Sequence, residues 1–118
     1  MKFLIVDDNA AMRRTIRNIV ALPDDETREC SDGASLVSEY DSFRPDWVLM
    51  DLRMEPVNGI AATRILKAAF PQAHVAIVTN YGEQEYREEA GSAGAERFFM
   101  KDNLPAIRKQ LDTSGRNG

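Results

Sequence analysis

Residues 47–51 read Trp47-Val48-Leu49-Met50-Asp51, in which four apolar side chains are followed by a carboxylate. A short, continuously apolar run of this kind is typical of a strand that is buried on both faces of a parallel sheet. Three further runs end on polar residues in the same way: residues 3–6 before Asp7 and Asp8, residues 75–78 before Thr79, and residues 98–100 before Lys101. Because ligands of an open α/β sheet bind at the carboxyl ends of its strands, the four runs predict a binding site at that edge.

Amphipathic helices are predicted between these strands. Apolar residues recur at helical spacing in five segments, at residues 12–20, 36–43, 62–69, 86–93 and 104–111. Residues 26–30 are polar and alternating, which indicates a fifth strand at an edge of the sheet. Alternating strands and helices with short connections require parallel strands and right-handed crossovers. We therefore expect a flavodoxin-like α/β fold, a doubly wound (βα)5 domain with a five-stranded parallel sheet in the order 2-1-3-4-5 and helices on both faces.

The composition limits the size and class of the protein. A chain of 118 residues has room for one domain, and 43% apolar with 29% charged residues is the balance of a soluble globular protein. The net charge of -4 argues against nucleic-acid binding. Cys30 is the only cysteine, so no intrachain disulfide and no zinc cluster of thiolates is expected. The N-terminal apolar run is too short for a signal peptide or a membrane span, so we expect no membrane insertion and a cytoplasmic location.

Three carboxylates are expected to converge at the predicted site. If the first and third strands are neighbours, Asp7, Asp8 and Asp51 meet in one small pocket, where their negative charges would repel each other and destabilise the fold. A compensating cation is then required. Few hard oxygen ligands, with places left for water and a phosphoryl group, suit Mg²⁺ better than a calcium cage. Three carboxylates, one Mg²⁺ and the ammonium of Lys101 sum to zero charge.

Phosphorylation of one carboxylate would break this charge balance, and the predicted site is suited to such a reaction. A carboxylate beside Mg²⁺ can attack a phosphoryl donor, because the metal screens the repulsion between two anions and stabilises the charge on the phosphoryl oxygens. Thr79 could donate its hydroxyl to one of these oxygens, and Lys101 could pair with another.

At this point the residues match a known family, because the chain resembles the response-regulator receiver domain over essentially its whole length. The match consists of an acidic pair after the first strand, an aspartate after the third, a glycine eight positions later, a threonine after the fourth strand, a Gly-Ala pair before the fifth and a lysine at its end. These residues are Asp7, Asp8, Asp51, Gly59, Thr79, Gly94, Ala95 and Lys101. As an ordered set the pattern is specific, although each element alone is weak. We expect a receiver domain over residues 1–112 and a flexible C-terminal tail over residues 113–118.

The resemblance implies a phosphoacceptor and a set of metal ligands. Asp51 would be the phosphoacceptor. Asp8 would bind Mg²⁺ directly and Asp7 through water. Asp51 and the backbone carbonyl of Arg53 would complete the protein ligands.

The resemblance also implies a switch. Thr79 would be the switch hydroxyl, Lys101 the phosphate-pairing ammonium, and Phe98 the switch aromatic, although a plain core position is an equally good interpretation of Phe98. Arg53 and Tyr81 occupy positions that in this family flank the approach of the hydrolytic water. We hypothesise that these two large side chains screen the aspartyl phosphate and slow its loss.

Two positions depart from the family pattern. Asp102 follows Lys101 where the family usually has a proline in a cis peptide, which leaves the reach of Lys101 open. In the loop after Asp51, Glu55 stands in the usual place of a proline, and Pro56 follows it. Glu55 either retunes metal binding or points to solvent and pairs with a nearby base.

The resemblance implies the partners as well. The phosphodonor would be a sensor histidine kinase or a histidine phosphotransfer protein, and the surface of the fourth helix, fifth strand and fifth helix would bind a downstream target protein or form a homodimer. Arg13, Arg14 and Arg17 are expected on the outward side of the first helix, near where the family meets its donor, although a solvated face explains them equally well. The chain would catalyse its own phosphorylation and slow autodephosphorylation without being an enzyme.

Three other interpretations compete with this one. A nucleotide- or flavin-binding module needs glycines or hydroxyls where this chain has Asp7 and Asp8. An aspartyl-phosphate enzyme would usually have a second acid close to Asp51, where Leu52-Arg53 follows. The alternative that stays is a degenerate receiver that acts as a phosphorylation-independent protein-interaction module.

Overall fold

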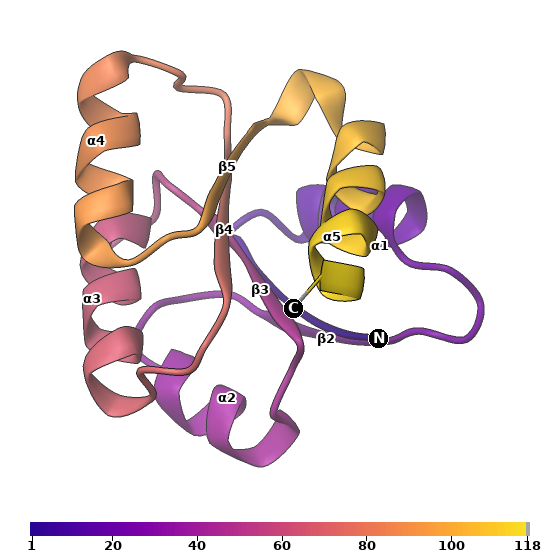
Figure 1. The fold of residues 1–118 in the computed structure, drawn as a ribbon. Helices are drawn as coiled ribbons and strands as arrows, with labels where there is room; N and C mark the ends of the chain where they lie inside the picture. The colour runs from indigo at the N-terminus through magenta and orange to yellow at the C-terminus, as the bar shows by residue number, and fades with distance from the viewer. Residues whose placement is uncertain (118) are drawn as a thin grey trace.

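Five parallel strands form the middle layer of the structure (Figure 1), a computed structural model that describes residues 1–117, with side chains described through Leu111. The strands are β1 (Lys2–Val6), β2 (Glu26–Cys30), β3 (Trp47–Asp51), β4 (Val75–Thr79) and β5 (Arg97–Met100). They pair in the order β2-β1-β3-β4-β5. The polar strand β2 lies at an edge, as its alternating sequence predicted.

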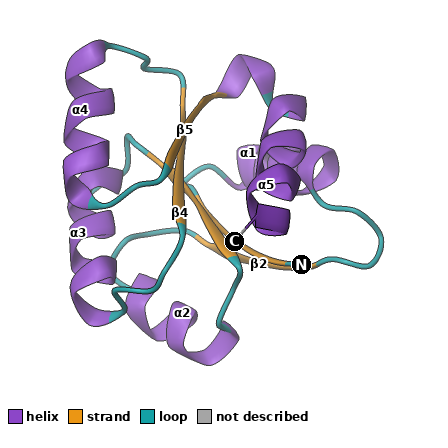
Figure 2. Ribbon diagram, viewed as in Figure 1, coloured by secondary structure: helices purple, strands orange, loops and turns teal. Residues whose placement is uncertain are grey.

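Helices cover both faces of this sheet (Figure 2). The helices α1 (Ala10–Val20) and α5 (Pro105–Asn117) lie on one face, and α2 (Leu36–Phe43), α3 (Gly59–Ala69) and α4 (Gln84–Ala93) lie on the other. A short 3-10 helix, η1 (Lys101–Asn103), joins β5 to α5. The predicted flavodoxin-like, doubly wound α/β fold is confirmed, together with its strand order.

Alternate residues of the strands build two cores, one under each layer of helices. In β1, Phe3 and Ile5 belong to the cluster that includes Ile107 of α5, whereas Leu4 belongs to the cluster that includes Leu66 of α3. Each of these side chains is at most 1% exposed. Burying one such side chain stabilises the fold by about 1.5–3 kcal/mol. A slip of a strand by one residue would exchange its two faces, so the two cores fix the register that aligns the strand ends.

Capping side chains begin the two helices next to the predicted site. The side-chain oxygen of Asn9 accepts a hydrogen bond from the backbone N–H of Met12 at 3.0 Å and so begins α1. Asn58 does the same for α3, accepting from the backbone N–H of Ala61 at 2.9 Å. The helix α1 thus begins four residues after the end of β1, and α3 begins eight residues after the end of β3.

The helix α5 is longer than its apolar pattern indicated. The pattern ended at residue 111, whereas the backbone is helical to Asn117. Gly118 lies outside the described residues. The division into a domain of residues 1–112 and a flexible tail of residues 113–118 stays a prediction. Across residues 1–117, no helix combines the length and the apolar character that a membrane crossing requires.

Candidate functional site

The predicted acidic cluster forms at the carboxyl edge of the sheet. Strands β1 and β3 are neighbours, with Val6 paired to Met50, so the residues that follow them meet. One carboxylate oxygen from each of Asp7, Asp8 and Asp51 lies within 4.8 Å of the other two. Asp7 is 1% exposed and Asp51 6% exposed, whereas Asp8 is exposed to solvent. The structure thus brings together three carboxylates from two strands, and two of them are buried.

Lys101 supplies one positive charge to this cluster. Its ammonium nitrogen lies 2.9 Å from Oδ2 of Asp7 and 3.1 Å from Oδ1 of Asp51. The peptide bond between Lys101 and Asp102 is trans, because the one cis bond within residues 1–117 precedes Pro56. A cis peptide after the lysine is therefore not needed for the ammonium to reach the pocket. One ammonium against three carboxylates leaves the cluster with a net negative charge.

Burial and the neighbouring charges shift the pKa values of two groups in the pocket. The pKa of the Asp51 carboxyl is raised by burial first and then by the negative charges of Asp7 and Asp8, against which Lys101 acts in the opposite direction. Burial alone would lower the pKa of the Lys101 ammonium, but its interactions with the carboxylates of Asp7 and Asp51 outweigh this effect, so that this pKa is raised. The pocket therefore favours a bound cation and disfavours an uncompensated carboxylate at Asp51.

The donor set fits a divalent cation. Oδ2 of Asp7 is buried and faces the Lys101 ammonium as an ion pair, yet it has no hydrogen-bond partner of good geometry within the described part of the chain. An oxygen with unused lone pairs beside two further carboxylates matches the preference of Mg²⁺ for a few hard oxygen ligands. The residues present therefore fit Mg²⁺.

Gly59 explains why a glycine belongs to the sequence pattern. It is the first residue of α3, and its backbone N–H donates to the carbonyl of Leu52 at 2.8 Å. A Cβ atom at this position would lie 2.0 Å from the backbone oxygen of Asp51, which no side chain tolerates. The close approach of α3 to the end of β3 therefore fixes the backbone of the central carboxylate.

Thr79 and Lys101 reach the same edge from the other side of Asp51. Asp51 pairs with Val78 of β4, so Thr79 stands one residue beyond it, and Thr79 in turn pairs with Met100, directly before Lys101. Thr79 is fully buried, and its hydroxyl oxygen accepts from the backbone N–H of Tyr81 at 3.0 Å. Because this bond uses a lone pair, the hydroxyl proton stays available for a second partner.

Arg53 and Tyr81 lie together, as their predicted role requires, and a third residue joins them. The guanidinium of Arg53 lies 4.2 Å from the centre of the Tyr81 ring. It also donates to the hydroxyl of Tyr86 in α4 at 2.9 Å. Sequence reasoning treated Tyr86 only as an apolar position of the fourth helix. No pattern along the chain connects it with Arg53, 33 residues earlier.

Phe98 combines features of both interpretations that the sequence left open. It is partly buried and packs against the core under α3 and α4. Its ring also lies 4.6 Å below the guanidinium of Arg87, which is exposed on α4.

Glu55, in the loop after β3, is exposed and has no ion pair within the described residues. It therefore points to solvent, as one of the two interpretations expected, but it does not pair with a base.

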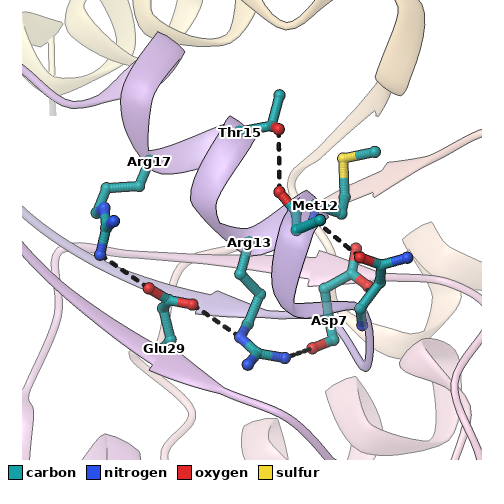
Figure 3. Close-up of polar contacts among 8 residues, drawn as sticks. Asp7, Met12, Arg13, Thr15, Arg17 and Glu29 are labelled. Atoms are coloured by element: carbon teal, nitrogen blue, oxygen red, sulfur yellow. Dashed lines mark hydrogen bonds and ion pairs between the residues drawn. The ribbon is translucent and has the colours of Figure 1, made fainter.

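The arginines of α1 do not all face outward (Figure 3). Arg13 is 15% exposed, and it donates from Nε to Oε1 of Glu29 and from Nη1 to the backbone carbonyl of Asp7. Arg17 donates to the other carboxylate oxygen of Glu29 at 2.9 Å. Arg14 is exposed as expected, and the side chain of Arg17 is 40% exposed. A carboxylate on the edge strand β2 draws Arg13 and Arg17 toward the sheet, and the sequence pattern of α1 contains no sign of it.

The fold and the pocket together define an α/β protein whose parallel sheet gathers three carboxylates, a threonine and a lysine at the carboxyl ends of β1, β3, β4 and β5. The family model of the response regulator receiver domain matches residues 3–112. The chain therefore belongs to the receiver-domain family, whose members act in two-component signalling, and the predicted resemblance is confirmed.

Relatives and solved structures agree with this assignment. The chain is 36% identical over 117 residues to the chemotaxis protein CheY of Bacillus subtilis, covering 94% of this chain and 98% of that protein. It is 34% identical over 107 residues to YhcZ, an uncharacterized transcriptional regulatory protein of the same organism, covering 89% of this chain but only 50% of YhcZ. It thus spans about half the length of some regulators that it matches. A two-component response regulator of the LuxR family from Aurantimonas has a TM-score of 0.87 at 27% identity, covering 96% of this chain and 82% of that one.

Proposed function

We propose that Asp51 accepts a phosphoryl group from a phosphohistidine in a sensor histidine kinase or a histidine phosphotransfer protein, in a reaction that depends on Mg²⁺. The observation that carries this proposal is the convergence of Asp7, Asp8 and Asp51 within 4.8 Å, with Lys101 bridging two of them. The phosphorylated form would change the surface of α4, β5 and α5, which would then bind a downstream target protein or a second copy of the chain.

The position of Asp51 suits it to be the nucleophile. It ends the central strand β3, with the acidic pair after β1 on one side and Thr79, the last residue of β4, on the other. A carboxylate oxygen of Asp51 forms a bond to phosphorus while the bond from phosphorus to the imidazole nitrogen breaks, and the imidazole leaves with that electron pair. The product is an acyl phosphate on Asp51.

The three carboxylates would together hold the metal. Asp8, which is exposed, and Asp51 would bind Mg²⁺ directly, Asp7 would bind it through water, and the backbone carbonyl of Arg53 would complete the protein ligands. When bound, Mg²⁺ screens the repulsion between carboxylate and phosphoryl group and stabilises charge on the phosphoryl oxygens. After phosphorylation the ammonium of Lys101 would form an ion pair with a phosphoryl oxygen instead of with the Asp51 carboxylate.

Thr79 and Phe98 would carry the signal outward. The free proton of the Thr79 hydroxyl would be donated to a phosphoryl oxygen, which draws in the loop after β4. Phe98 would then turn inward, and its contact with Arg87 on α4 would change as it does so. Such a step shifts the population of two existing arrangements, and the faces of α4 and β5 are where it would be detected.

Arg53 and Tyr81 would control how long the signal lasts. Their stacked side chains, held to α4 through Tyr86, stand at the two positions that flank the approach of the hydrolytic water. We expect slow autodephosphorylation and no sustained turnover, so the chain acts as a phosphoacceptor and not as an enzyme. No feature of the pocket favours the degenerate alternative, because every side chain of the phosphoacceptor pattern is present.

The test is direct phosphorylation by a small donor. The purified chain is incubated with MgCl₂ and acetyl phosphate, and intact mass spectrometry is expected to show the addition of one phosphoryl group. Asp51→Asn is expected to abolish this addition. Asp46→Asn is the matched control, because Asp46 is an exposed aspartate just before β3, at the opposite edge of the sheet. Wild-type protein that stays unmodified while binding Mg²⁺ would overturn the proposal in favour of the degenerate receiver.

A further inference from the structure

We propose that Arg13, oriented by Glu29, is a positioning residue for the Mg²⁺ site. Arg13 contacts the backbone of Asp7 and not the carboxylates that would bind the metal. The inference rests on the proposed function, since it assumes that Asp7 and Asp8 hold Mg²⁺. In this arrangement Glu29 of the edge strand β2 acts through Arg13 of α1 and so sets the backbone geometry of Asp7 and Asp8, the acidic turn after β1.

The contacts form an unbroken chain from β2 to the acidic turn (Figure 3). Glu29 stands opposite Ile5 in the pairing of β1 with β2, with a side chain that is 29% exposed. Its Oε1 accepts from Nε of Arg13 at 2.8 Å. Nη1 of the same guanidinium donates to the backbone carbonyl of Asp7 at 2.7 Å. The carboxylate thus fixes the plane of the guanidinium, and the guanidinium fixes the carbonyl.

The carbonyl of Asp7 is a sensitive point, because it belongs to the peptide that joins the two acidic residues. Rotation of this peptide would move Asp8, whose side chain is exposed and makes no hydrogen bond among the described residues. The side chain of Asp7 is held separately, since its Oδ1 accepts from the backbone N–H of Asn9 at 2.9 Å and its Oδ2 faces Lys101. These contacts hold the side chain of Asp7, and Arg13 holds its backbone carbonyl, which belongs to the peptide that leads to Asp8.

A simple charge effect would act in the opposite direction. Arg13, Arg17 and Glu29 carry a net charge of plus one near the pocket, which by itself opposes binding of a cation. If Arg13 mattered only as a charge, its removal would strengthen Mg²⁺ binding, and a lysine in its place would change nothing. If Arg13 positions the turn, lysine is not equivalent, because one ammonium nitrogen replaces two N–H donors on separate atoms of a rigid plane.

The experiment measures the Mg²⁺ dissociation constant by isothermal titration calorimetry and, on the same samples without metal, the free energy of unfolding by urea denaturation. Arg13→Lys is expected to weaken Mg²⁺ binding roughly tenfold, as other residues that orient metal ligands do. Arg17→Lys is the matched control, because Arg17 shares Glu29 but does not touch Asp7, and it is expected to stay within about twofold of wild type.

A double-variant comparison shows whether Glu29 acts through Arg13. Glu29→Ala is expected to weaken Mg²⁺ binding in the wild-type background and to have no further effect in the Arg13→Lys background, because residues acting as one unit are not additive. Glu29→Gln is a milder second variant should Arg13→Lys fold poorly, and it is expected to lie between wild type and Glu29→Ala.

Each other outcome overturns the inference. An unchanged dissociation constant in Arg13→Lys means that only charge or only stability is involved, and a loss of unfolding free energy without a change in Mg²⁺ binding shows a purely structural role. Equal effects of Glu29→Ala in both backgrounds would point to its charge alone. Wild-type protein that takes up no Mg²⁺ would instead overturn the proposed function, so the two failures are distinguishable.

Discussion

Replacing a glycine by alanine is expected to have opposite effects at two helical positions of this chain. At Gly59, a new Cβ would lie 2.0 Å from the backbone oxygen of Asp51, so α3 and the end of β3 would have to separate by about 1 Å to reach a tolerable contact. Overpacking of this kind costs about 1–3 kcal/mol. At Gly91 in α4, a new Cβ would meet nothing within 4 Å, and alanine is the better helix former by about 0.5–1 kcal/mol.

Urea and thermal denaturation of the two variants measure this difference. Gly59→Ala is expected to lower the melting temperature and Gly91→Ala to raise it, by roughly 4 °C for each kcal/mol in a chain of this size. Gly59→Ala should also slow phosphorylation by acetyl phosphate at least tenfold, because a displacement of about 1 Å at a reacting group can cost on the order of 10²-fold in rate. A Gly59→Ala variant as stable as wild type, or a shift of the same sign at both positions, would refute the reasoning.

Three further predictions concern the ion pairs of Asp25, a helix cap and the lifetime of the phosphoryl group. Burial would raise the pKa of Asp25, but hydrogen bonds from Leu22 and the N-terminal ammonium and the charge of Arg108 outweigh it, and the pKa is lowered. The stability that this carboxylate contributes is therefore present above its unfolded pKa of about 3.8 and is lost as the pH falls through the lower folded value. Thermal denaturation of Asp25→Asn should show lower stability at pH 7 and a smaller difference from wild type at pH 2; an equal difference at both would contradict this. Asn9→Ala should cost about 1 kcal/mol in urea denaturation through loss of the α1 cap, and no loss would show that the cap is dispensable. Replacing Arg53 and Tyr81 by alanine should shorten the half-life of the phosphorylated protein, followed by intact mass after removal of the donor, and an unchanged half-life would end the screening hypothesis.

The sequence predicted the sheet and the acidic pocket because both depend on short-range patterns. Runs such as residues 47–50 have no polar face, so only a strand covered on both sides accommodates them. The alternation with helices makes the strands parallel, and the order 2-1-3-4-5 comes with the flavodoxin-like fold that this pattern favours. Once the strand carrying Asp51 lies beside the strand that precedes Asp7, the meeting of the carboxylates is a consequence of topology.

The sequence could not predict contacts between side chains on different elements. Arg13 and Arg17 looked like an outward face because helical spacing gives the direction of a side chain only relative to its own helix. Glu29 turns both toward the sheet, and it belongs to a strand whose packing distance from α1 is set by tertiary structure. The hydrogen bond between Arg53 and Tyr86 could not be predicted for the same reason, since the two residues meet only when α4 packs against the loop after β3.

The trans peptide at Lys101 also lies beyond what the sequence could decide. Because Asp102 stands where the family usually has a proline, the sequence alone does not tell whether the loop changes its backbone or the side chain of Lys101 changes its position. Here the η1 turn follows β5 directly, and the ammonium still spans Asp7 and Asp51.

The bridging position of Lys101 means that the protein holds a stand-in counterion of its own. Unlike a small zinc domain, whose fold is lost with its metal, this chain keeps part of its acidic charge neutralised from within. Chelation of divalent ions is therefore expected to prevent the proposed phosphorylation of Asp51 without unfolding the chain, so that the folded protein could be phosphorylated again once the metal is restored.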